Sequence, residues 1–442
     1  MNINNGLKFG FIPESAIIVT AAALAGALAG LGSFFLHSWL GVLSRWLHTP
    51  LEISGFNYQF LLYVPVGIIG ALMYQRFLGE NLEGSTGIIK GVLKSGNLNL
   101  KDNYCYSPLL GCLMTVGMGG SAGAEGPCAL SGAAMGGKVG RWFKLTPESR
   151  RLIFGCGAAA GIAGIFKSPV GGFFFAVEVL QLEMTVLGMM ACITSTLMAF
   201  AVAYVLGGFQ WNIEIMPDLQ FVPDHFGWIA LLGVVCGLYS IYYSKTQEWT
   251  GRFFRNIKAR WISAAISGVG VGVVVFLLPA MFGEGYGLVS DVLNGIDKTL
   301  LAYAPYYEDA DKIWVMFGII GAMLLLKGAI VGAVNNGGGV AGEYVPTIFA
   351  GCLIGYVFAT FCNMHGLDLP VENFALIATA AAMAGIIKAP LMSTFIAAEV
   401  SARYSFLLGF ILASAISFSI VRFYNIMSNR KRGNGDVKGV AS

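Results

Sequence analysis

The stretch GAEGP, residues 123–127, places a glutamate within a long apolar part of the chain and follows it with glycine and proline. A glycine-rich run that ends in proline is a signal for the start of a helix. Such a start leaves several backbone N–H groups without partners and carries about half a positive charge. Glu125 is therefore predicted at a helix end that attracts anions, where its own carboxylate competes with an external anion for the same amides.

The composition of the chain is that of a membrane protein. Of the 442 residues, 56% are hydrophobic and 12% are charged, whereas about 25% are charged in an average soluble domain. Apolar runs long enough to cross a hydrocarbon core of about 30 Å recur at 16–39, 228–243, 261–282 and 406–421. We expect an all-helical, multi-pass protein of the inner or plasma membrane, surrounded by lipid. The net charge of +3 is too small to indicate a nucleic-acid partner.

An ionisable side chain at membrane depth is costly. On insertion scales an intramembrane carboxylate costs about 2.5–3.5 kcal/mol, so such a residue is first interpreted as functional. We expect Glu125 to block an anion path when it is ionised and to swing away when it is protonated. The alternative is that Glu125 only caps a helix through its favourable interaction with the helix dipole.

The chain contains an internal repeat. AGIFKSPVGGFFFAVEV at 163–179 aligns with AGIIKAPLMSTFIAAEV at 384–400. Each copy follows a glycine-rich run that ends in proline, GGSAGAEGP in the first and GGGVAGEYVP in the second. A weaker third pair, GSTGIIKGVL from Gly84 and GEGYGLVSDVL from Gly283, keeps the same order. Interrupted apolar segments at corresponding places of two repeats are typical of a transporter with a site near the membrane midplane.

The repeat predicts how the chain is divided. The most polar segment, 210–225, separates a first repeat over 12–209 from a second repeat over 226–428. Residues 429–442 form a basic tail, which the positive-inside rule places in the cytoplasm.

Three glycine-rich helix starts, at Gly84, Gly123 and Gly342, recur in the repeats. Together their partial charges offset about one monovalent anion without a lysine or arginine. Partial charges bind an ion less tightly than a full cation does, so an ion leaves as well as enters. The three starts predict an anion pathway.

GAEGP, followed by AAAGIAGIFKSPVGGFFFAVE at 158–178, resembles the CLC family of chloride channels and proton-coupled chloride transporters. GEYVP stands where the family has Gly-Ile-Phe-x-Pro, and GSTGI where it has Gly-Ser-Gly-Ile-Pro. The resemblance implies two inverted halves of tilted, partly broken transmembrane helices. It also implies a homodimer with one pore in each subunit. We expect no cytoplasmic CBS domain after Arg432, as in prokaryotic members.

The resemblance implies roles for individual residues. Glu125 matches the gating glutamate, whose side chain imitates chloride. Ser85 matches the serine that contacts the central anion, and Thr86 is the alternative register. The amides of Glu343 and Tyr344 match the backbone donors of the second-half motif.

Further residues complete the predicted site. Gly123, Gly126 and Gly342 belong to the helix starts that bind the anion. Tyr424, near the last helix, is the candidate for the tyrosine that closes the inner gate of the family. Glu178 aligns with the glutamate that ends the repeat segment, and we group it with the gating and proton residues.

Two departures from the family pattern bear on proton coupling. Many proton-coupled members carry a second glutamate directly after the position of Glu178, whereas this chain has Val179. Glu343 stands where the family usually has an aliphatic residue, and it is a candidate proton relay; a dipole-stabilised first-turn glutamate is the alternative. We expect a chloride/proton exchanger gated by Glu125, with a passive, pH-gated chloride channel as the alternative. Chloride, fluoride and nitrate remain open as the anion.

Charged residues occupy equivalent places in the two repeats. Glu399 has the position of Glu178, and we expect it to pair with Arg403, four residues on, rather than to act in transport. Lys167 and Lys388 also correspond. They either line vestibules and attract anions or extend from helix ends to the interface.

One motif suggests an enzyme. GGSAG at 119–123 fits the G-x-S-x-G elbow of serine hydrolases, so an intramembrane serine hydrolase is the remote alternative. It requires a histidine base at membrane depth, and the four histidines lie mostly near segment ends or linkers. The eight cysteines are scattered singly and predict neither a disulfide framework nor a metal site. We expect no enzymatic activity and no cofactor.

Overall fold

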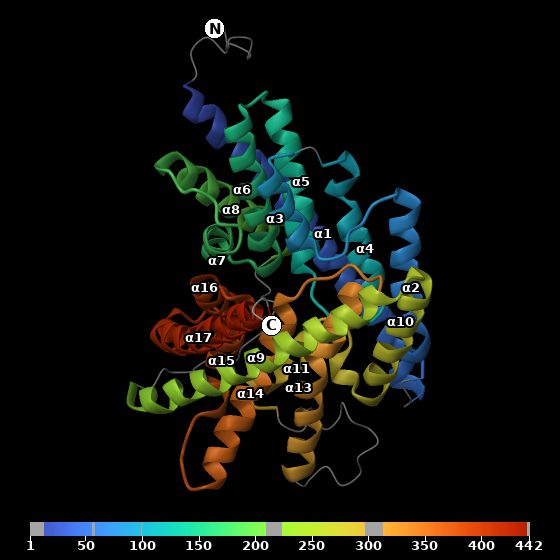
Figure 1. Cartoon of the computed structure of the whole chain (residues 1–442), viewed down its shortest axis with the longest axis vertical. Coiled ribbons are helices and arrows are strands. Elements are labelled where there is room, and N and C mark those ends of the chain that lie inside the picture. Colours follow the sequence, from blue (N-terminus) through green and yellow to red (C-terminus); the bar gives the residue numbers. More distant parts are fainter. Residues whose placement is uncertain (1–12, 55–57, 99, 209–222, 297–312, 440–442) are drawn as a thin grey trace.

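The computed structural model describes residues 13–54, 58–98, 100–208, 223–296 and 313–439 (Figure 1). These residues form mainly α-helices, as predicted, with a few short 3₁₀ segments and one π-helix, Phe175–Val179. The first half contains α1 (Glu14–Ser54), α2 (Phe60–Leu78), α3 (Ser85–Ser95), α4 (Ser107–Thr115), α5 (Glu125–Trp142), α6 (Pro147–Phe166), α7 (Pro169–Phe174) and α8 (Val186–Gly207). The second half contains α9 (Phe226–Asn256), α10 (Arg260–Leu277), α11 (Tyr286–Leu293), α13 (Ile313–Asn336), α14 (Tyr344–Met364), α15 (Val371–Ile387), α16 (Pro390–Val400) and α17 (Leu407–Gly439).

Eight of the described helices are long and apolar enough to cross a membrane. They are α1, α2, α8, α9, α10, α13, α14 and α17. Shorter apolar segments at 169–179, 371–387 and 390–400 lie between them. The chain is a multi-pass membrane protein that contains both full-length spans and shorter helices.

Glycine makes two of the interrupted helix starts possible. α3 begins after Gly84 at φ 65°, and α11 begins after Gly285 at φ 80°. Both values lie in the left-handed region, which glycine adopts without the steric cost of a Cβ atom. The two glycines belong to the third pair of repeated segments, so the two halves begin equivalent helices in the same way.

The two halves contact each other through equivalent helices. In order along the chain, α2 corresponds to α10, α5 to α14 and α7 to α16, and each of these pairs is in contact. Figure 1 shows α2 beside α10 and α7 beside α16. Contacts between equivalent elements are what a two-fold relation between the halves produces.

A backbone bridge marks the centre of this relation. The N–H of Gly123 donates to the carbonyl of Gly342 at 3.2 Å, and the N–H of Gly342 donates to the carbonyl of Gly123 at 2.6 Å. The two glycines are equivalent in the repeat, and they form an antiparallel pair that exchanges both bonds. The halves therefore run in opposite directions where they meet.

Reciprocal carboxylates join α16 to α7 and to the short π-helix, Phe175–Val179, that continues α7. Glu178 accepts hydrogen bonds from the amides of Leu391 (3.1 Å) and Met392 (2.9 Å) in the first turn of α16. Glu399 accepts from the amides of Val170 (3.1 Å) and Gly171 (2.9 Å) in the first turn of α7. The terminal glutamate of each repeat therefore caps a helix of the other repeat.

The predicted pairing of Glu399 with Arg403 is wrong. Besides the amides of α7, Glu399 accepts a 2.5 Å bond from the hydroxyl of Ser168. α16 ends at Val400, and Ala402 has a positive φ of 54°. Arg403 therefore does not follow Glu399 by one helical turn, which the prediction required.

The predicted domain limits remain predictions. Residues 209–222 of the inter-repeat segment lie outside the described residues, and a short turn at 223–225 leads into α9. α17 continues to Gly439, so the helix enters the predicted basic tail.

Candidate anion site

The bridged glycines bring two helix N-termini together. α5 begins at Glu125 and α14 at Tyr344, each two residues after its bridged glycine. The start of α3 lies beside them, because a Cβ atom on Gly126 would lie 3.2 Å from the Cα of Gly342 and 3.5 Å from the Cβ of Ser85. The three predicted helix starts thus converge.

α5 is held in place by close packing on α6. A methyl group on Gly132 would overlap the carbonyl oxygen of Gly157, and a methyl group on Gly157 would overlap that of Gly132. Small residues allow helix backbones in membranes to approach this closely. The contact fixes the axis of α5 and with it the position of Glu125.

The Glu125 carboxylate lies at the convergence. Its side chain is fully buried, and its Oε1 accepts a hydrogen bond from the amide of Tyr344. Its Oε2 is buried without a hydrogen-bond partner. A Cβ atom on Gly123 or Gly342 would collide with this carboxylate, and on Gly342 it would also lie 2.7 Å from the backbone nitrogen of Gly126, so Gly342 leaves no room for a side chain.

Ser85 and Thr86 are placed differently at the start of α3. Ser85 is 2% exposed, and its hydroxyl has no hydrogen-bond partner. The hydroxyl of Thr86 lies 3.3 Å from the hydroxyl of Tyr344. Of the two alternative registers, Ser85 is therefore the one with a free donor beside Gly126.

A cavity of about 560 Å³, here called the α3 cavity, opens beside this serine. Ser85, Thr86 and Glu343 line it, together with the basic side chains of Lys90 and Arg255. Asn335 also lines it and is 5% exposed, and its side-chain amide lies beside the Glu343 carboxylate. The α3 cavity thus combines these two cations with the carboxylates of Glu83, Glu248 and the predicted relay Glu343, and the Ser85 hydroxyl offers a donor to an anion.

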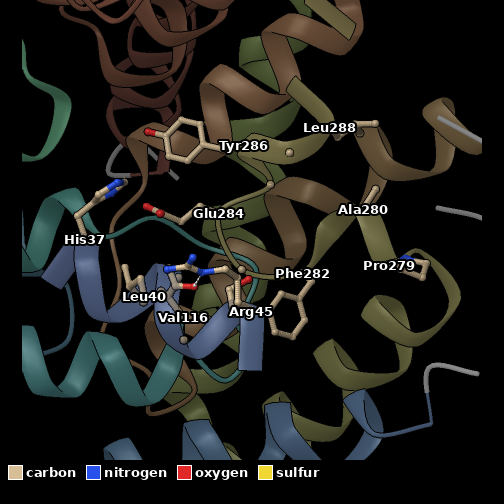
Figure 2. Close-up of a pocket in the computed structure, with 16 residues that line it drawn as sticks. His37, Leu40, Arg45, Val116, Pro279, Ala280, Phe282, Glu284, Tyr286 and Leu288 are labelled. Carbon is tan, nitrogen blue, oxygen red and sulfur yellow. Dashed lines mark hydrogen bonds between the residues drawn. The ribbon is translucent and has the colours of Figure 1, made fainter. Parts of the chain in front are cut away.

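A second cavity, of about 730 Å³, opens beside the equivalent helix start in the second half (Figure 2). We call it the α11 cavity; it is lined by His37 and Arg45 of α1, Val116, and Phe282, Glu284 and Tyr286 around the start of α11. Its Glu284 accepts a 3.3 Å hydrogen bond from the amide of Ala124, the residue before Glu125. Because the halves are inverted, we infer that the two cavities lie on opposite sides of the glycine bridge.

Sequence analysis missed two residues near Glu125. Glu284 carries a signal, since it stands directly before the helix-start glycine of GEGYG as Glu83 does before Gly84. Lys327 is a single cation in the apolar helix α13 and is fully buried. It donates a 2.9 Å hydrogen bond to the hydroxyl of Ser121, so it holds the loop that leads to Gly123.

Ser121 is the serine of the hydrolase-like motif. With Lys327 it forms a serine–lysine pair, although no histidine was predicted to reach it. Both side chains have 0% exposure, so a substrate bond does not reach the Ser121 hydroxyl in this structure. The hydrogen bond between Lys327 and Ser121 supports a structural role, in which it holds the loop that leads to Gly123.

Two predicted site residues lie away from the convergence. Tyr424 packs under Lys245, with the Nζ atom 4.6 Å from its ring centroid, and the structure does not bring it to Ser85. Tyr344 instead places a tyrosine hydroxyl beside Thr86, the residue after Ser85. Glu178 is engaged in capping α16.

A family model described as "Voltage gated chloride channel" matches residues 66–422. The chain belongs to this family. The H(+)/Cl(-) exchange transporters ClcA of Vibrio campbellii and Vibrio vulnificus are each 26% identical over 435 residues, which is 93% of this chain and 88% and 87% of the relatives. A putative chloride channel protein ClcB-like of Ralstonia nicotianae is 27% identical over 315 residues, 68% of each chain.

Solved structures confirm the predicted CLC fold. A slow cyanobacterial Cl⁻/H⁺ antiporter superposes with a TM-score of 0.78 at 18% identity, over 96% of this chain and 99% of the other. A CLC-type fluoride/proton antiporter superposes with a TM-score of 0.75 at 20% identity, over 92% and 96%.

Proposed function

We propose that this CLC protein exchanges chloride, or a related small anion, for protons, with Glu125 as the gate. The observation that carries the proposal is the position of the Glu125 carboxylate, which accepts the amide of Tyr344 where two helix N-termini meet. An external anion and the carboxylate compete for this place. Protonation removes the charge of Glu125 and weakens its hold on the amide, so proton uptake favours anion entry.

The donors that the anion gains support weak, reversible binding. When Glu125 leaves, the amide of Tyr344 becomes free, and the unpaired hydroxyl of Ser85 lies next to Gly126. The helix ends add partial positive charge. Among the charged groups that line the α3 cavity, Lys90 and Arg255 attract the anion, and Glu83, Glu248 and Glu343 oppose it.

Glu343 supports a proton path toward the α3 cavity. It lines that cavity and precedes Tyr344, whose amide binds Glu125. We propose that it relays protons in place of the glutamate that Val179 replaces. Relatives named H(+)/Cl(-) exchange transporters favour exchange, whereas Val179 is the specific feature that favours a passive, pH-gated channel.

We further propose a homodimer in the inner or plasma membrane, with one pathway in each subunit. The eight apolar spans support the membrane location. The mass of the complex in detergent, after subtraction of bound detergent and lipid, distinguishes one copy from two.

The test is to reconstitute the purified protein in liposomes and to record anion and proton fluxes together under a chloride gradient, with fluoride and nitrate in parallel. Uphill proton movement identifies an exchanger. Chloride flux without proton movement identifies the channel. The absence of flux for all three anions would contradict both.

A further inference from the structure

We propose that Glu284 transfers protons between the α11 cavity and Glu125. This inference rests on the proposed exchange function and extends it to a residue outside the family motifs quoted above. Glu284 stands at the start of the second-half segment GEGYG, 159 positions after Glu125.

The first step of the argument is access. Glu125 is fully buried and is not among the residues that line the α3 or α11 cavity. Glu284 is only partly buried and lines the α11 cavity. A proton that arrives through this cavity therefore meets the carboxylate of Glu284 before that of Glu125.

The second step is proximity. Glu284 Oε1 accepts the amide of Ala124 at 3.3 Å, and Ala124 directly precedes Glu125. Glu125 in turn has one carboxylate oxygen that is buried and unpaired. Two carboxylates thus occupy successive positions at the N-terminus of α5, one facing the cavity and one inside the protein.

The third step is the contrast with Glu83, the equivalent residue of the first half. Glu83 forms an ion pair with Arg260, which favours its charged form. In the described part of the chain Glu284 has no ion pair, and the bond from Ala124 is a single neutral donor. Among the described residues Glu284 therefore lacks a cationic partner like the Arg260 that stabilises the ionised form of Glu83.

Other charged and titratable groups surround Glu284. His37 and Arg45 of α1 and Tyr286 of α11 line the same cavity, and Figure 2 shows the Glu284 carboxylate directed between His37 and Tyr286. On the far side, the ring of Phe349 packs against Gly285. Lys327 lies 4.3 Å from the centroid of that ring.

The transfer is a simple exchange of O–H bonds. A hydronium ion in the α11 cavity gives a proton to the Glu284 carboxylate and becomes water, and the protonated carboxyl group then releases the amide of Ala124. The new hydroxyl donates to the unpaired oxygen of Glu125, directly or through one water. An O–H bond breaks on Glu284 and forms on Glu125, and Glu284 returns to its charged form. With Glu343 beyond Glu125, three carboxylates connect the two cavities.

Glu284→Gln tests the proposal in proteoliposomes. Glutamine keeps an oxygen that accepts from Ala124 but carries no titratable proton. We expect proton flux to fall at least about tenfold, since a positioned proton donor contributes about 10²–10⁴-fold to a transfer step. Glu284→Asp should restore a substantial part of the flux. Tyr286→Phe and His37→Gln, in the same cavity, should retain coupling.

The outcomes separate a relay from a helix cap. If Glu284 only caps α5, Glu284→Gln will match the wild type and Glu284→Ala will lose stability; wild-type coupling in Glu284→Gln would therefore overturn the proposal. Loss of coupling in His37→Gln alone would also overturn it. In a Glu125→Gln background, Glu284→Gln should change neither flux further, and retained anion flux shows that the variant folds.

The wild-type measurement distinguishes this proposal from the function on which it rests. Anion flux without proton flux in the wild type would refute exchange and the relay together. A wild-type exchanger whose Glu284→Gln variant keeps its stoichiometry would refute the relay alone.

Discussion

Replacing Glu125 with alanine removes the side chain that competes with the anion for the amide of Tyr344. In the structure Oε1 of this carboxylate accepts a hydrogen bond from the amide of Tyr344, and Oε2 accepts none from the described residues. A hydrogen bond to a charged group is worth about 1.5–3 kcal/mol. Loss of the competitor should therefore tighten anion binding by about 10- to 150-fold, because about 1.4 kcal/mol corresponds to a factor of ten.

Calorimetric titration of chloride into detergent-solubilised wild type and Glu125→Ala measures this change. Glu125→Gln is the matched control, since its neutral oxygen still accepts from the amide, and it should tighten binding by about tenfold or less. Neither variant titrates, so proton flux in liposomes should vanish while anion flux persists. Equal chloride affinity in the wild type and Glu125→Ala would refute the competition.

Three further predictions follow from the same contacts. Glu343→Gln should abolish proton flux and retain anion flux in liposomes; unchanged stoichiometry would remove Glu343 from the proton path. Glu399→Gln should lower the free energy of unfolding by about 2 kcal/mol through its weakened bonds to α7, seen as a lower melting temperature with unchanged coupling; an unaltered melting temperature would argue against the cap. Tyr344→Phe, which loses the bond to Thr86, should raise anion turnover about fivefold, the equivalent of about 1 kcal/mol, whereas Tyr424→Phe should leave turnover unchanged. Faster anion turnover in Tyr424→Phe than in Tyr344→Phe would contradict the placement of the Tyr344 hydroxyl on the anion path.

The helix starts were predictable because their signals are local. Glycine followed by proline in GAEGP and GEYVP predicts two helix starts. Because the two motifs occupy corresponding places in the two repeats, the two helix starts are predicted to be equivalent. From equivalence and inversion it follows that the two starts face each other, as the bridge between Gly123 and Gly342 shows. The all-helical membrane fold was predictable from composition for the same reason.

Residues whose role depends on distant contacts were not predictable. The role of Glu284 depends on a hydrogen bond from Ala124, 160 positions away in the sequence. The role of Lys327 depends on a hydrogen bond to Ser121, 206 positions away. Tyr424 has the residue type expected for an inner gate, but only the packing of α17 on α9 shows that it meets Lys245. The Arg403 prediction assumed a helix that in fact ends at Val400.

The reciprocal carboxylates, Glu178 in the π-helix after α7 and Glu399 in α16, have a consequence for biogenesis. While the first half is being synthesised, the amides of Val170 and Gly171 have no acceptor, because Glu399 has not yet left the ribosome. Glu178 likewise has no hydrogen bond from the amides of Leu391 and Met392 until those residues are synthesised. The nascent N-terminal half therefore enters the bilayer without these hydrogen bonds. A polypeptide that stops before residue 390 lacks both the Glu399 carboxylate and the amides that Glu178 binds.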